Sequence, residues 1–150
     1  MADPLSITAA AVGITAFAIS GIETLHNFIQ DYSGADAEIT AIASNLKIIQ
    51  TTLGALAPLL DSSTDQEVSD RAKKDLERYG VAMAVNDCGQ ACVGFQRDIE
   101  NWTKHSSNGQ LSKRDRLSVG VWHKEEVRTH RTMVETCQKG VQFATQSVQL

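Results

Sequence analysis

The fold of this chain is decided by an uncharged stretch near the N-terminus, residues 5–22, which reads LSITAAAVGITAFAISGI. A helix of this composition is apolar on every side, so other helices or a lipid bilayer must cover it. Its two glycines, Gly13 and Gly21, are eight residues apart and are expected on roughly the same face of one helix. Whether other helices or a lipid bilayer bury this stretch is therefore the main question for both the fold and the function.

The predicted first helix has Asp3 as its N-cap and Pro4 at its first position, and it continues to about residue 31. One apolar stripe with the spacing of a helix face consists of Ile7, Ala11, Ile14, Ala18, Gly21, Leu25 and Phe28. A second stripe beside it consists of Leu5, Ala9, Val12, Ala16 and Ile19. Two apolar stripes are typical of a helix that is buried on two sides, at the centre of a bundle.

The second predicted helix, about residues 35–57, has the clearest heptad pattern in the chain, which requires a helical partner. Its apolar positions are Ile39, Ile42, Leu46, Ile49, Leu53, Leu56 and Leu60. Pro58 disturbs the end of this helix. Thr64 and Glu67 have the spacing of a capping box for the helix that follows.

The third predicted helix, about residues 66–104, changes phase near Gly80, which predicts a kink or break there. Its first stripe is Val68, Ala72, Leu76, Tyr79 and Met83, and its second is Val85, Cys88, Cys92, Phe95, Ile99 and Trp102. Residues 111–123 are expected to form a short basic helix followed by an irregular piece. The last helix begins at Lys124 and has its stripe at Val127, His130, Val134, Cys137, Val141, Ala144 and Val148.

These patterns predict an all-α fold, an antiparallel bundle of four long helices plus a short basic helix or irregular segment, with the first helix central. A chain of 150 residues fits one domain, so we expect residues 1–150 to form a single unit. The helical pattern continues to Leu150 without a glycine cap. We therefore expect the domain to be the N-terminal part of a longer protein.

Charge and cysteine content restrict the partners and the compartment. The net charge of −4 is not that of a nucleic-acid-binding protein. The three cysteines are an odd number, which favours free thiols in the cytoplasm. The N-terminus has Asp3 and no basic residue, unlike a secretory signal. Residues 5–22 are near the lower length limit for a membrane span, but without basic flanking residues a permanent span is not expected.

No catalytic, cofactor or metal site is predicted, and we expect the domain not to be an enzyme. Cys88 and Cys92 share a helix face and could be half of a metal site or a redox pair, but small buried apolar residues are the preferred interpretation. His130 and Cys137 are seven residues apart, about 10 Å along a helix, which is too far for a nucleophile–base pair. Phosphate-binding, dinucleotide-binding, hydrolase and zinc-protease motifs are all missing from the sequence.

Two groups of residues are candidates for interaction. The first is the uncharged helix, which could serve as a tight core helix, enter a membrane or pack against copies of itself; its residues are Leu5, Ile7, Val12, Gly13, Ile14, Phe17 and Gly21. The second is a basic patch that could bind anionic lipid head groups or, as the favoured alternative, pair with the acidic first helices. Its residues are Lys113, Arg114, Arg116, Trp122, Lys124, Arg128 and Arg131.

The opening residues, MADPLSITAAAVGI, resemble the start of fungal HeLo-like domains that precede NACHT or ankyrin-repeat regions in STAND (NOD-like) proteins. A related group is named after an azaphilone pigment cluster protein. The resemblance extends to the second helix, the helix around Cys88 and the segment with Trp122. It implies a helical bundle from a fungal intracellular protein whose first helix enters membranes after oligomerisation. That role would fall on residues 5–22, with Gly13 and Gly21 as close-packing positions in a sparse glycine zipper.

The resemblance leads us to expect a non-enzymatic signalling or effector domain of a fungal NOD-like receptor-type protein (NLR), active in innate immunity. It would act through oligomerisation and through membrane-targeted cell death by the first helix. One alternative is a pure protein–protein interaction or oligomerisation module. Another is small-molecule binding in fungal secondary metabolism, which requires a closed apolar pocket. The expected partners are the chain itself, other protein domains and, on activation, anionic membrane; the expected location is the cytoplasm, with recruitment to the plasma membrane.

Overall fold

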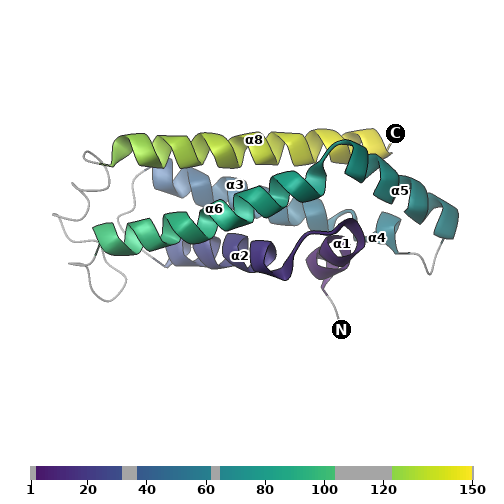
Figure 1. Cartoon of the computed structure of the whole chain (residues 1–150), viewed down its shortest axis with the longest axis horizontal. Helices are drawn as coiled ribbons and strands as arrows, with labels where there is room; N and C mark the ends of the chain where they lie inside the picture. The colour runs from purple at the N-terminus through teal and green to yellow at the C-terminus, as the bar shows by residue number, and fades with distance from the viewer. Residues whose placement is uncertain (1–2, 32–36, 62–64, 104–122, 150) are drawn as a thin grey trace.

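The computed structural model describes residues 3–31, 37–61, 65–103 and 123–149. Within these ranges every regular element is an α-helix, which confirms the predicted all-helical fold (Figure 1). The helices are α1 (Pro4–Val12), α2 (Ala16–Gln30), α3 (Ala37–Gly54), α4 (Ala57–Leu60), α5 (Gln66–Arg78), α6 (Val81–Trp102) and α8 (Lys124–Gln149). The predicted basic segment at residues 111–122 lies outside the described residues.

The four longest helices lie lengthwise against one another, and α1, α4 and α5 gather at the end where α2 and α6 begin (Figure 1). Around the molecule the order is α2, α3, α8, α6. The core is the predicted stripe of α3 together with the facing stripes of its neighbours. Fully buried side chains in it include Ile42, Leu46, Ile49, Leu53, Val85 and Val134.

Two of the four lengthwise contacts are parallel, so the predicted antiparallel arrangement is wrong for them. Thr15 at the start of α2 meets Asn86 near the start of α6. Glu38 at the start of α3 meets Arg128 near the start of α8. The pairs α2–α3 and α6–α8 are antiparallel. Heptad spacing determines which face of a helix is buried, but it carries no information on the neighbour or its direction.

The predicted first helix is broken in two, which corrects the prediction of one helix at the centre of a bundle. α1 ends at Gly13, whose φ of 88° is left-handed, and Thr15 caps the start of α2. The Asn86 side chain accepts the Thr15 N–H at 2.8 Å and donates to the Gly13 carbonyl at 3.2 Å. α1 packs on α3 and α4, whereas α2 packs on α6 and α3. The break persists because Asn86 bonds two backbone groups that a continuous helix would bond internally.

Other predicted boundaries agree with the structure to within a few residues. Asp3 caps α1 by accepting the Ser6 N–H at 2.8 Å. The break near Gly80 is confirmed, with φ of 68° between α5 and α6. The predicted capping box is replaced by Asp65, whose carboxylate accepts the Glu67 N–H at 3.0 Å. Thr64, the predicted cap, lies outside the described residues.

Candidate functional site

The predicted membrane or self-association residues are divided between α1, the turn and α2. Leu5, Ile7 and Val12 are half-buried on α1, and Ile14 is buried in the turn. α1 is anchored by the buried Thr8, whose hydroxyl donates to the Leu53 carbonyl of α3 at 2.6 Å. No helix in the described part of the chain combines the length and the apolar character needed to span a membrane.

The two glycines of this stretch have different structural roles. A Cβ at Gly21 would lie 2.5 Å from the Gly89 carbonyl oxygen and 2.9 Å from Val93 Cγ2, so α2 and α6 approach closely at this point. A Cβ at Gly13 would meet nothing within 4 Å. Gly13 instead supplies the positive φ of the turn, where a side chain would be strained. Of these two glycines, therefore, Gly21 permits close packing of helices within the chain and Gly13 does not.

The cysteines lie in the core between α6 and α8. Cys88, Cys92 and Cys137 are all buried, as their interpretation as small apolar residues predicts. A hydrogen bond with Cys88, together with burial, raises the pKa of the Cys137 thiol. A protonated, buried thiol is a poor nucleophile. Among the residues that the structure describes, no group of His, Cys, Asp and Glu side chains could hold a metal ion.

His130 packs in the same core rather than in a catalytic pair with Cys137. Its ring stacks on Phe95 with centroids 4.1 Å apart, and its Nε2 lies 3.8 Å from Cys92 Sγ. Burial lowers the pKa of His130 to about 4, so the ring is neutral at pH 7. The arrangement is that of a packed core histidine.

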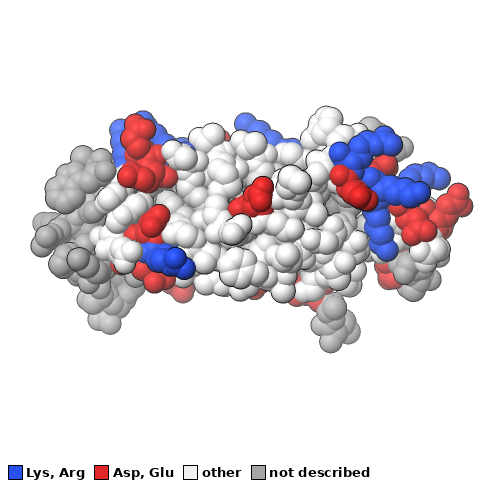
Figure 2. Space-filling view, viewed as in Figure 1, with Lys and Arg blue, Asp and Glu red and all other residues white. Residues whose placement is uncertain are grey.

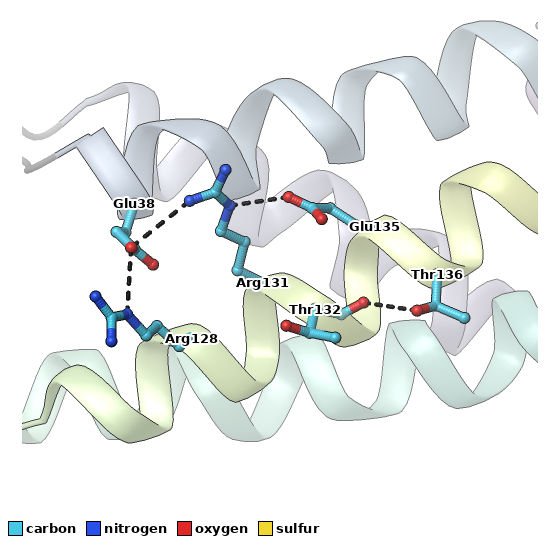
Figure 3. Close-up of polar contacts among 6 residues, drawn as sticks. All are labelled: Glu38, Arg128, Arg131, Thr132, Glu135 and Thr136. Carbon is cyan, nitrogen blue, oxygen red and sulfur yellow. Dashed lines mark hydrogen bonds and ion pairs between the residues drawn. The ribbon is translucent and has the colours of Figure 1, made fainter.

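The predicted basic patch is engaged with α3 where the structure describes it. Arg128 and Arg131 both approach Glu38 of α3, at 3.5 and 3.6 Å, and Arg131 also bonds Glu135 at 2.9 Å (Figure 3). Lys124 is exposed at the start of α8. The other patch residues, Lys113, Arg114, Arg116 and Trp122, lie outside the described ranges. For the two arginines this supports pairing with the acidic N-terminal half over lipid binding.

Three exposed apolar side chains, which we name the junction patch, were not predicted from the sequence as an exposed group. The junction patch consists of Tyr79 at the end of α5, Met83 on α6 and Phe143 on α8, which are 44%, 72% and 60% exposed. The rings of Tyr79 and Phe143 meet edge to face with centroids 5.6 Å apart. The first apolar stripe predicted for residues 66–104 includes Tyr79 and Met83, but the structure leaves both side chains exposed. Phe143 falls outside the 3-4 stripe of the last helix, and that departure was the signal that could have identified it as exposed.

Charged side chains are unevenly distributed over the face that contains α6. Figure 2 shows that they gather towards the two ends of the molecule and are few in the middle. In the middle of this face, a binding partner would therefore meet mainly uncharged side chains.

Neither a curated protein nor a solved structure matches this chain. One protein-family model does match, over residues 2–150, and its description is "Pigment biosynthesis cluster protein PigL N-terminal". This confirms the resemblance to a pigment-cluster group. Because the match covers almost the whole sequence, the chain belongs to the family of PigL N-terminal domains.

Proposed function

We propose that this domain is a HeLo-like, non-enzymatic signalling module of a fungal NOD-like receptor-type protein, and that it acts in the cytoplasm by associating with copies of itself. The observation that carries the proposal is the junction patch. Tyr79 follows α5, Met83 lies on α6 and Phe143 lies on α8, and all three large apolar side chains are in contact with water.

The composition of the junction patch is that of an interface centre. Aromatic residues and methionine are enriched in the buried part of protein–protein interfaces, where charged residues are depleted. Methionine also adapts its shape to different partners, because its side chain is unbranched and flexible. Burial of the Phe143 side chain between two chains would contribute about 1.5–3 kcal/mol to the free energy of association.

Sedimentation equilibrium over a hundredfold range of protein concentration tests this proposal. We expect the wild-type chain to form a defined oligomer and Phe143→Ser to weaken association at least tenfold. Phe17→Ser is the matched control, because Phe17 is 59% exposed but lies on α2, away from the junction patch. A wild-type chain that stays monomeric throughout, or equal effects of the two serine variants, would refute self-association through this patch.

A second candidate is membrane action by residues 5–22, and the exposure of Phe17 favours it. Phe17 presents an aromatic ring to solvent from a stretch without charges, as membrane-binding segments do. α1 has only nine residues, fewer than the roughly 20 that a span needs. Entry into a bilayer therefore requires α1 and α2 to leave their present packing, including the Thr8–Leu53 hydrogen bond.

Leakage of dye from phosphatidylserine-containing vesicles tests the membrane candidate. Phe17→Glu places a charge at an exposed position, so the soluble fold should persist while leakage is lost. Gly13→Glu is less informative, because any side chain at a φ of 88° strains the turn itself. Vesicles that stay sealed to the wild-type chain at every lipid composition would rule this candidate out and leave the self-association proposal untouched.

A further inference from the structure

A groove of about 280 Å³ runs along the surface between α2 and α6. We propose that this groove binds an amphipathic monocarboxylic acid, with its carboxylate on Arg97 and its apolar body against Phe17 and Val93. The proposal does not depend on self-association, because the groove and the junction patch have no residue in common.

The groove exists because of the close approach of the two helices. The backbones of α2 and α6 touch at Ala18, Gly21 and Gly89, which have little or no side chain to separate them. Gly21 and Val93 therefore form a shallow floor, and larger side chains on both helices rise beside it. A ligand lying on this floor would contact backbone and a branched apolar side chain.

One end of the groove is apolar and the α2 side of it is uncharged. Phe17 lines this end with an exposed ring, which can stack on a flat apolar group. Ser20 and Thr24 follow along α2, and neither hydroxyl is bonded to another described residue. These hydroxyls can bond a polar substituent on the body of a ligand.

The other end of the groove has a cationic side chain, that of Arg97. Arg97 is exposed, and its guanidinium forms no ion pair with any carboxylate of the described residues. A guanidinium binds a carboxylate through two parallel hydrogen bonds. Glu100 lines the same end, and its carboxylate accepts the Gln96 amide at 3.0 Å. One positive and one negative side chain at this end favour a singly charged ligand, because Glu100 would repel a second negative charge.

The separation of the two ends sets the size of the ligand. α2 and α6 are parallel, and the Gly21–Val93 contact places Thr24 level with Arg97. From Phe17 to Thr24 is seven residues of helix, about 10 Å at 1.5 Å per residue. A bicyclic aromatic acid has about this length, and we therefore choose 2-naphthoate as the probe.

Titration followed by ¹⁵N amide and arginine side-chain NMR tests the proposal. We expect 2-naphthoate to shift the signals of Gly21, Val93 and the Arg97 Nε–H group with saturable binding. The uncharged 2-naphthamide has the same shape and should bind at least tenfold more weakly. Arg97→Gln should remove this preference for the acid, and Phe17→Ser should weaken binding of both probes about tenfold.

Two further variants make the outcome decisive. Glu100→Gln removes the repulsive charge and should strengthen binding of 2-naphthoate several-fold. Phe143→Ser, a matched loss of an exposed phenyl ring in the junction patch, should leave binding unchanged. The proposal is overturned if shifts fall outside the groove, if 2-naphthamide binds as tightly as 2-naphthoate, or if Arg97→Gln has no effect. The substituted groove positions are largely exposed, so circular dichroism should show that each variant is folded.

Discussion

At the scale of single residues, Gly89 is, among the glycines in the described ranges, the one where an added methyl group would come nearest to other atoms. A Cβ there would overlap the backbone of Ala18 on α2. We expect Gly89→Ala to lower the free energy of unfolding by about 1–3 kcal/mol, because two helix backbones must separate to accommodate it. Gly94→Ala on the same helix is the control, because a Cβ there meets nothing within 4 Å. The higher helix propensity of alanine should raise the free energy of unfolding of this variant by about 0.5–1 kcal/mol. Urea unfolding measures the free energy of unfolding of both variants. Equal values for the two would contradict the close contact between α2 and α6 at Gly89.

His130 gives the domain a pH dependence of predictable sign. Its pKa falls from 6.5 to about 4 on folding, because burial disfavours the charged ring. Between these pH values the unfolded chain binds a proton that the folded chain does not, so stability is lost as the pH falls through this window. The slope of the free energy of unfolding against pH approaches about 1.4 kcal/mol per pH unit in this window. Urea unfolding at pH 7 and pH 5 should show a larger loss for the wild-type chain than for His130→Gln; equal losses would assign the effect to other groups.

At the scale of elements, the sequence predicted the helical periodicity and the break near Gly80, but it did not predict the break at Gly13. The part of the stripe from Ile39 to Leu53 predicted α3, because a helix buried on one face has apolar residues about every 3.6 positions. The break at Gly13 could not be predicted, because its stabilising partner, Asn86, is 73 residues further along the chain. The family resemblance implies close packing at Gly13, whereas in the structure Gly13 supplies the positive φ of the turn. Phe17 was identified as a candidate, but Arg97, which lines the other end of the same groove, was not, since only the α2–α6 contact brings the two residues to one site.

The α1–α2 break should depend on Asn86 in a graded way. Asn86→Ala removes both hydrogen bonds to the turn and should cost about 0.5–1.5 kcal/mol for each bond, because the Thr15 N–H and the Gly13 carbonyl are exposed and can bond water instead. Asn86→Asp keeps the acceptor for Thr15 and loses the donor to Gly13, so it should cost less. Hydrogen exchange of the Thr15 amide measures the local effect. Unchanged exchange in both variants would show that the turn is held by other contacts.

At the scale of the whole molecule, α3 and α8 pack in parallel, and the ion pairs of Glu38 with Arg128 and Arg131 directly probe that register. Glu38 and Arg128 are 90 residues apart in sequence, yet they meet because α3 and α8 begin at the same end of the molecule (Figure 3). Arg131 also reaches Glu38, one turn further along α8. An antiparallel α3–α8 pair would place these groups at opposite ends, and no coupling between them would then be measurable.

A double-mutant cycle with Glu38→Gln and Arg131→Gln therefore tests the architecture itself. We expect a measurable coupling at low salt, since the guanidinium and the carboxylate lie 3.6 Å apart, and a smaller coupling in 1 M NaCl, where screening of exposed charges is strong. Arg131 also bonds Glu135 on its own helix, so a cycle of Arg131 with Glu135→Gln provides the local comparison. That second coupling would be present in any helical α8, whatever its neighbour. Coupling to Glu135 without coupling to Glu38 would thus contradict the parallel α3–α8 contact while leaving the helix intact.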